Sequence, residues 1–477
     1  MNASESHVES SKYQQRIKEL LEHNDELEQR NQDLAAENKR LRELLKGKGE
    51  SKGSKKPKFP LKYSLETRQG KRQRRHRSTG RRNQAQKLDL ITDIEEIYPP
   101  TVHWQDCILH REQYAWRIID GQAEYVCYSI YDRPESKALP TVPGLRNSRS
   151  EYGLEIILMV AFLHYWIGMS LDHVCDVLRF FTQLELPKSQ ADSLLTQLST
   201  DWSQQYDTIA ELLALQLVIY VDETGWKVGK DNCYTWAFST ALHVLFRCGV
   251  SRSKSEAQAV LGEMFDGIGV SDDYGAYKHL FETHQLCWAH LLRKAIKLML
   301  QYPDETQYAQ FLETLFDIYQ QAIRFQRDGR LSVGRTRKVE QLQEQIRQLC
   351  TLAGQPIDPL NTATDTATFI RLHNELVDGI EALFVFVEHP EVEATNNRSE
   401  RNVRREAEIR KGGRTSKSDK GAHRRSIIMT VLATLNTRFE KFTLDKLLSE
   451  VERWRDVGLS LFQMELSELE KAQPPPV

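Results

Sequence analysis

Two short apolar runs of this chain end in aspartate, and this pattern restricts the fold more than any other feature. Asp222 follows the β-branched run LVIYV, and Asp272 follows GIGVS. Such runs are typical of buried strands, so each aspartate is expected at a strand end. Glu400 lies far along the chain, in the arginine-rich segment ATNNRSERNVRR, which we interpret as a helix. We therefore expect an α/β fold in which three carboxylates converge on a pair of divalent ions.

The segments around these acids predict the order of elements in the second half of the chain. LQLVIYVDETGWKV, NCYTWAFSTA and HVLFRCGVS are separated by short polar turns and predict three antiparallel strands. SKSEAQAVLGEMF predicts an amphipathic helix, GIGVSDDYGAY a further strand, and CWAHLLRKAIKLML the start of a helical region. Residues 300–390 hold further helical segments, and residues 395–410 and 422–452 are predicted to be helices. This order indicates an α/β domain with a helical insertion.

The chemistry that three such carboxylates support is metal-dependent phosphoryl transfer. Two ions about 3.5–4 Å apart can activate a nucleophile and stabilise the leaving oxygen. Magnesium prefers oxygen ligands, so Asp222, Asp272 and Glu400 would suffice to hold two Mg²⁺ or Mn²⁺ ions. Glu223 and Asp273 are competitors, but successive strand residues face opposite sides. The choice between Asp272 and Asp273 stays open, and strand-end carboxylates are often simply turn formers.

Positive charge is concentrated in two places although the net charge is only −2. Residues 51–87 hold fourteen Lys and Arg against one acid, and residues 398–425 hold eleven against four. Such blocks indicate a polyanionic partner. We interpret residues 51–94 as a disordered basic linker that contacts DNA phosphates, with a solvated spacer as the alternative.

Basic and polar residues around the predicted glutamate helix fit a DNA cleft. Those predicted to hold phosphates are Arg401, Arg404, Arg405, Lys411 and Arg414. Salt bridges from these arginines to Glu406 and Glu408 are the alternative interpretation. Asn396 and Asn397 are expected either to cap the helix or to orient Glu400 or a metal-bound water.

The N-terminal 50 residues carry a heptad repeat. Leucines occupy one seam position and asparagines the other: Leu20, Leu27, Leu34 and Leu41, with Asn24, Asn31 and Asn38. This combination is typical of a parallel two-stranded leucine zipper, so we predict a coiled coil over residues 1–50 that makes a homodimer or a larger assembly. A single solvated helix is the alternative.

A helical region over residues 151–215 has the length and periodicity of a helix–turn–helix, in MSLDHVCDVLRF, a break at ELPKS, and QADSLLTQLS. Lys188, Ser189 and Gln190 would open the second helix, where base-contacting side chains project. An ordinary helical hairpin that binds no DNA is the other interpretation.

The cysteine pattern and the apolar content bear on compartment. Seven cysteines, an odd number without a CxxC pair, argue against a disulfide framework and fit a reducing cytosol. The longest apolar stretch contains Glu155 and His164 and is short for a membrane span, so we interpret it as a buried helix. We expect a soluble cytoplasmic protein without a membrane partner. Residues 95–150 are predicted to form a small domain of short strands, whose scattered histidines and cysteines lack the close pairing typical of structural zinc.

The motifs YVDETGWKV, SDDYGAY, CWAHLLRK and TNNRSERNVR, in this order, resemble the DDE transposases of the insertion-sequence sixty-six family. GGRTSKSDKGAHRRSIIMTVLATLNTRF resembles the segment that follows the glutamate in that family, and the resemblance covers roughly residues 150–450. It implies a ribonuclease-H-like core with a helical insertion and a triad at Asp222, Asp272 and Glu400. It also implies a bacterial, nucleoid-associated enzyme that acts on terminal repeats and target DNA, with small accessory proteins. Many members carry a zinc-ribbon-like segment whose cysteine pairs are lacking in residues 95–150.

Cys287 and His290 form a Cys-x-x-His pair that could be half of a zinc site. No second half is evident, and both positions lie on one helix face. We therefore favour a structural role near the active site over zinc binding.

The sequence thus predicts a transposase that cleaves element ends and transfers strands. The alternatives are a catalytically silent DNA-binding relic and a structure-selective nuclease on the same core. The predicted divisions are residues 1–50, 51–94, 95–150, 151–215, 216–299, 300–394 and 395–477, the last holding the catalytic glutamate and C-terminal helices.

Overall fold

The computed structural model describes residues 84–137, 139–277, 279–358 and 362–472. The chain divides into two units, Met1–Arg81 and Arg82–Val477, and all described residues belong to the second. The predicted coiled coil and most of the basic linker therefore lie outside the described residues. The described end of that linker, residues 84–94, forms a short helix and the start of a strand, so the expectation of disorder is wrong there. Within the described residues, every helix is too short or too polar to cross a bilayer.

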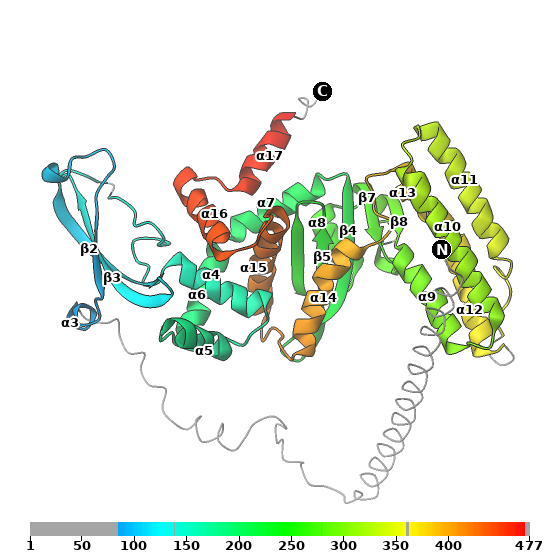
Figure 1. Ribbon diagram of the computed structural model, residues 1–477, viewed down its shortest axis with the longest axis horizontal. Coiled ribbons are helices and arrows are strands. Elements are labelled where there is room, and N and C mark those ends of the chain that lie inside the picture. The colour runs from blue at the N-terminus through cyan, green and yellow to red at the C-terminus, as the bar shows by residue number, and fades with distance from the viewer. Residues whose placement is uncertain (1–83, 138, 278, 359–361, 473–477) are drawn as a thin grey trace, which may run out of the picture. The chain divides into compact units, whose positions relative to one another are not determined.

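A three-stranded sheet opens the described part, after the short helix α3 (Gln84–Leu88) (Figure 1). Its strands, in the spatial order β1-β3-β2, are β1 (Asp93–Ile97), β2 (Ile108–Ile119) and β3 (Gln122–Asp132). The expectation of short strands here is wrong, since β2 and β3 have 12 and 11 residues. They pair along their whole length because Asp120 and Gly121, at φ 48° and 80°, form a tight left-handed turn that suits a hairpin.

Helices fill the next region, where one buried cluster packs them together and against the following sheet. They are α4 (Leu154–Ala161), the π-helix η2 (Phe162–Trp166), α5 (Leu171–Thr182), α6 (Lys188–Asp201) and α7 (Ser203–Ala214). The helix α5 begins where the Ser170 hydroxyl accepts a hydrogen bond from His173 N, and it ends at Gln183 in the left-handed conformation. The two helices of the predicted helix–turn–helix are present, and their recognition of DNA stays a prediction.

A five-stranded sheet lies at the centre of the unit, in the order β6-β5-β4-β7-β8. Its elements are β4 (Val218–Val228), β5 (Asp231–Ser239), β6 (Val244–Val250), α8 (Lys254–Leu261), β7 (Phe265–Ser271), η3 (Gly275–Tyr277) and β8 (Phe281–Leu286). The first three strands are antiparallel, whereas β7 runs parallel to β4 and β8 parallel to β7. The strands predicted at β4 to β7 and the helix at α8 are confirmed, while β8 was not predicted.

The open edge of β6 is covered by a helix whose hydroxyls bond to the strand. This helix is α15 (Asp419–Arg438). Ser426, Thr430 and Thr434 recur every four residues and accept hydrogen bonds from the backbone N–H groups of Cys248, Phe246 and Val244 at 2.9–3.1 Å. The edge is thereby closed against pairing with another chain.

A helical insertion separates β8 from the last helices, and one buried cluster packs its helices against residues of β4, β7 and β8. The helix α9 (Trp288–Gln301) leads into the insertion, whose own elements are α10 (Thr306–Arg327), α11 (Ser332–Leu349), α12 (Thr364–Asp378), η4 (Ile380–Ala382) and α13 (Val385–Glu388). Figure 1 shows these helices beside β7 and β8. The next helix, α14 (Asn397–Lys411), returns to the sheet and packs on β4 and β5.

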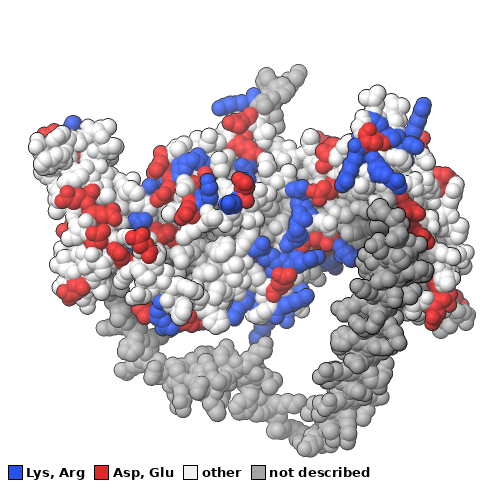
Figure 2. Space-filling model, viewed as in Figure 1, with Lys and Arg blue, Asp and Glu red and all other residues white. Residues whose placement is uncertain are grey.

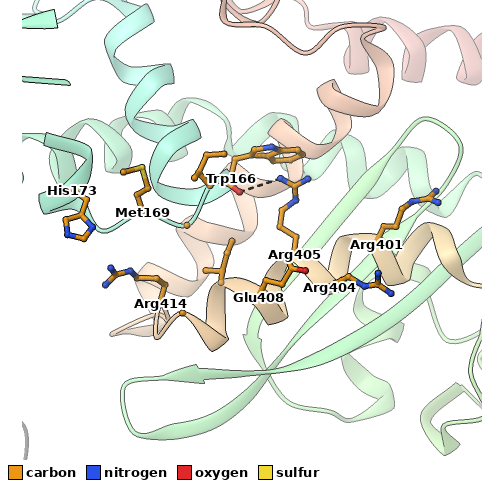
Figure 3. A pocket seen from close by; sticks show the side chains of 12 residues that line it. Trp166, Met169, His173, Arg401, Arg404, Arg405, Glu408 and Arg414 are labelled. Atoms are coloured by element: carbon orange, nitrogen blue, oxygen red, sulfur yellow. Dashed lines mark hydrogen bonds between the residues drawn. The ribbon is translucent and has the colours of Figure 1, made fainter. Parts of the chain in front are cut away.

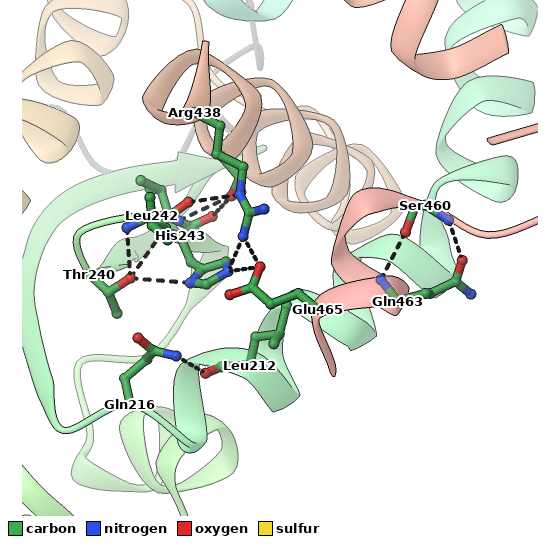
Figure 4. Close-up of polar contacts among 11 residues, drawn as sticks. Leu212, Gln216, Thr240, Leu242, His243, Arg438, Ser460, Gln463 and Glu465 are labelled. Atoms are coloured by element: carbon green, nitrogen blue, oxygen red, sulfur yellow. Dashed lines mark hydrogen bonds and ion pairs between the residues drawn. The ribbon is translucent and has the colours of Figure 1, made fainter. Parts of the chain in front are cut away.

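The C-terminal helices are α16 (Leu444–Val457) and α17 (Leu461–Ala472). The single helix expected over residues 422–452 is wrong, because the chain breaks after Arg438 and Thr443 caps a new helix by accepting from Lys446 N. Glu465 of α17 bonds to Arg438 and to His243 Nε2, the latter at 3.2 Å (Figure 4). These contacts tie α17 to the β5–β6 turn.

Candidate active site

The sheet places Asp222 and Asp272 beside each other. Tyr220 of β4 pairs with Val270 of β7 in parallel register, and each aspartate lies two residues further along its strand direction. Asp222 Oδ1 accepts from Glu223 N at 2.9 Å, and Asp272 Oδ1 accepts from Tyr274 N at 3.1 Å. Asp272 directly follows the end of β7, whereas Asp222 lies inside β4, which continues to Val228, so the expectation of a strand end is wrong for Asp222. The parallel pairing of β4 with β7 nevertheless places the two aspartates next to each other.

Electrostatics at Asp222 also involve Glu400. Burial, together with the weaker effect of the negative charges of Glu223, Asp272 and Glu400, raises the pKa of Asp222 to about 8. A carboxyl group with such a pKa holds a proton at neutral pH unless a cation replaces it. The three acids therefore form one electrostatic group whose charge a divalent cation would neutralise.

Glu223, the competitor of Asp222, faces a cationic partner of its own. Its Oε1 accepts from Arg252 Nε at 2.8 Å and Nη2 at 2.6 Å, and the Tyr277 hydroxyl donates to Oε2. Its side chain is 2% exposed. These contacts give Glu223 a structural role. Asp273, the competitor of Asp272, is exposed.

Glu400 lies in the first turn of α14 against the start of α9. Arg293 Nη2 donates to both Glu400 carboxylate oxygens at 2.9 Å. Cys287 Sγ lies 3.7 Å and His290 Nδ1 3.6 Å from Glu400 Oε1. The ligand atoms of Cys287, His290 and Glu400 all lie within 4.8 Å of one another, close enough to hold a metal ion. The CWAHLLRK motif thus surrounds the glutamate carboxylate.

Asn396 connects the glutamate helix to the aspartate strand. Its Nδ2 donates to the Val221 carbonyl, next to Asp222, at 2.7 Å, and its backbone N–H donates to Cys287 Sγ at 3.1 Å. It occupies the N-cap position of α14 without a side-chain capping bond, so the capping interpretation is wrong for Asn396. The amide points to the strand instead, because the Val221 carbonyl is its buried partner.

Replacing Asn396 by alanine should lower the stability of the protein. The change leaves the Val221 carbonyl without this donor in a buried place, which costs about 1–3 kcal/mol, and it loosens the connection between Asp222 and Glu400. Urea unfolding measures the loss. Asn397→Ala is the matched control, because Asn397 is exposed and its loss should change the unfolding free energy by about 0.5 kcal/mol or less. Equal behaviour of the two variants would contradict this role.

The basic residues predicted to bind DNA lie on or just after α14. Arg401, Arg404, Lys411 and Arg414 are exposed, while Arg405 is partly buried. Figure 2 shows Lys and Arg side chains gathered over the surface where Figure 1 draws α14. The salt-bridge alternative is wrong for Glu406, which is fully buried and accepts from Arg425 at 2.7 and 2.8 Å.

The residues predicted to contact DNA from the helix–turn–helix lie on α6, not on α14. Lys188 and Ser189 are exposed in the first turn of α6, and Gln190 is partly buried. Lys188 forms an ion pair with Asp172 of α5, so part of its charge is already used within the hairpin.

Three residues that contact the acidic side chains were not predicted. Arg252 and Tyr277 contact Glu223, and Arg293 contacts Glu400. Only Arg293 could have been found from the sequence. It follows His290 by three residues and therefore lies on the same helix face.

Comparison with known proteins bears on the whole arrangement. A family model described as Transposase IS66 family matches residues 149–424, more than half of the chain. A search of curated proteins found no match. The matched segment extends from just before α4 into α15 and includes all three carboxylates. On this match, the chain belongs to the IS66 family of transposases.

Proposed function

We propose that the protein cleaves DNA at the ends of a mobile element and transfers the cut strands into target DNA. The observation that carries this proposal is the grouping of Asp222, Asp272 and Glu400, expressed in the raised pKa of Asp222. Membership in a transposase family supports the class of reaction.

The core is proposed to be ribonuclease-H-like, formed by residues 216–299 and 395–477 around the insertion of residues 300–394. In support, three antiparallel strands are followed by two parallel ones in the order β6-β5-β4-β7-β8. The glutamate helix α14 then packs on the two strands β4 and β5.

Two Mg²⁺ or Mn²⁺ ions fit the donor set, because it offers three carboxylates and an excess of negative charge. Asp222 and Asp272 would hold them from the sheet, and Glu400 would complete the second position. Bound there, such ions supply activation of the attacking oxygen and neutralisation of charge on the phosphate. Zinc is not part of this proposal.

Two side chains of the protein position the carboxylates. Asn396 fixes the start of α14 against β4, and Arg293 holds the Glu400 carboxylate in place. In the proposed sequence, water attacks a phosphodiester at each element end, and the freed 3′-hydroxyl then attacks target DNA.

DNA binding is proposed for two groups of residues and for the basic linker. The first group lies at the start of α6 and consists of Lys188, Ser189 and Gln190, and the second lies on or just after α14 and consists of Arg401, Arg404, Arg405, Lys411 and Arg414. The N-terminal segment is proposed to join two copies on two element ends, with small accessory proteins in the assembly. A bacterial cytoplasmic, nucleoid-associated location follows from this role.

A cleavage assay on the DNA that flanks this gene tests the proposal. Purified protein with Mg²⁺ or Mn²⁺ should nick that DNA at defined ends, and chelation with EDTA should stop the reaction. The products are mapped by sequencing gels, with unrelated DNA as the control. Tight binding to the ends without cleavage, even after the neighbouring gene products are added, would instead indicate a binding-only relic. Cutting of branched DNA without joining would indicate a nuclease.

A further inference from the structure

A cavity of about 660 Å³ lies between α14 and the segment that follows the π-helix η2 (Figure 3). This volume is in the range of small-ligand sites. One wall is Trp166, Ile167, Gly168, Met169 and His173, and the other is Arg401, Arg404, Arg405, Glu408, Ile409, Gly412 and Arg414. The cavity thus joins the helical region before the core to the helix that carries Glu400.

The cavity is strongly cationic, because four arginines line it against one carboxylate. The Arg405 guanidinium stacks over the Trp166 indole with its Cζ 3.6 Å from the ring centre, and it donates to the Trp166 carbonyl at 3.5 Å. Burial lowers the pKa of Arg405, against the weaker opposing influence of Glu406 and Glu408. Within the described ranges Arg405 has no ion pair, since the Glu406 carboxylate is taken by Arg425.

A partly buried arginine without an ion pair favours the binding of an anion. Removing a guanidinium from water without a carboxylate partner is costly, and an incoming phosphate would offset that cost. Stacking on Trp166 fixes the plane of the guanidinium, which favours bidentate contact with phosphate oxygens.

The opposite wall is apolar and close. Gly168 has φ +82°, and a Cβ there would lie 2.7 Å from Ile409 Cγ1, so glycine allows this segment to approach α14. Ile167 beside it is 52% exposed at the cavity. A ligand in the cavity would therefore meet guanidinium groups of α14 and apolar side chains of the opposite segment, which suits a phosphate with an adjoining sugar.

We propose that this cavity binds a backbone phosphate of DNA, with Arg405 as its central cation and Ile167 and Met169 against the adjoining sugar. The proposal rests on the proposed function and extends it. It assigns DNA contact to Trp166–His173, outside the basic helix. The strand would be held between two elements next to the catalytic helix.

Equilibrium binding of full-length protein to fluorescent duplexes of two unrelated sequences tests this site. Arg405→Gln should weaken binding about tenfold, equally for both sequences, because a phosphate contact carries no base information. It should also reduce the slope of log affinity against log salt by about 1. Arg347→Gln, which removes the same charge from an exposed position on α11, should leave affinity and slope unchanged.

A second variant covers the case in which Arg405→Gln fails to fold. Ile167→Glu places a carboxylate at the cavity on an exposed position and should also weaken binding to both duplexes. Leu217→Glu, at a position that is 76% exposed outside the cavity lining, is its control. The phosphate site would be overturned if Ile167→Glu, and any Arg405→Gln protein that folds, kept the wild-type affinity and salt slope. The proposed function would then still stand. Weakening on only one sequence would also overturn it, and wild-type protein that binds neither duplex would overturn both proposals.

Discussion

Asp222→Asn should abolish metal-dependent DNA cleavage and leave DNA binding intact. Asparagine keeps the shape of the side chain but removes the charge that a divalent ion requires. Changing residues that merely support a metal ligand costs about 10- to 100-fold, so loss of the ligand itself should cost more than about 100-fold. The rate of end cleavage and the affinity for the same DNA are the two measurements.

Two controls accompany this variant. Asp273→Asn makes the same change at an exposed position beside Asp272 and should cleave at nearly the wild-type rate. Folding is checked by thermal unfolding in EDTA. Because the folded pKa of Asp222, about 8, is above its ordinary value of 3.8, the folded state binds the extra proton between these values. Wild-type stability should therefore fall as pH rises through this window, and the asparagine variant should lack that part of the fall. Wild-type cleavage by a folded Asp222→Asn protein would remove Asp222 from the site.

Arg425→Met should destabilise the protein by about 3–5 kcal/mol, because it leaves the Glu406 carboxylate buried without its partner. Glu406 is 0% exposed and Arg425 5% exposed, and the guanidinium also lies 4.8 Å from the Trp226 ring. The pair joins α14 to α15, so its loss should also disturb the position of Glu400. Urea unfolding monitored by circular dichroism gives the free energy.

The double variant Arg425→Met, Glu406→Leu separates the pair from the packing. It should recover much of the lost stability, since no unpaired charge remains. Arg179→Met, which removes an exposed partner of Asp176, should cost no more than about 1 kcal/mol. A small loss in Arg425→Met, equal to that of Arg179→Met, would contradict the role assigned to the buried pair.

Much of the central sheet could be predicted from sequence, because β4, β5, β6 and β7 are apolar runs bounded by turns. The strand β8 could not, since its sequence FETHQL lacks such a run. Gln285 is fully buried there and is satisfied by the Leu383 carbonyl and the Phe386 N–H of the insertion. Only the folded insertion supplies those partners, so no local pattern could have indicated them.

The carboxylates of the candidate site were predicted from strand ends and motif order, but their surroundings were not. Arg252 reaches Glu223 from the β6–α8 connection. Arg293 of α9 reaches Glu400, which follows in the sequence only after the inserted helices. Asn396 was correctly placed at the start of a helix, yet its side chain bonds to a strand rather than to the helix end. Such contacts depend on tertiary packing, which neither spacing nor propensity contains.

The central claim is that Asp222, Asp272 and Glu400 form one two-metal site. Anomalous scattering from crystals of the protein soaked in Mn²⁺ with a cut DNA end tests it most directly. Two manganese peaks are expected about 3.5–4 Å apart, bound by Asp222 and Asp272, with Glu400 completing the second site. A single peak held by Cys287, His290 and Glu400, with none at the aspartates, would contradict it.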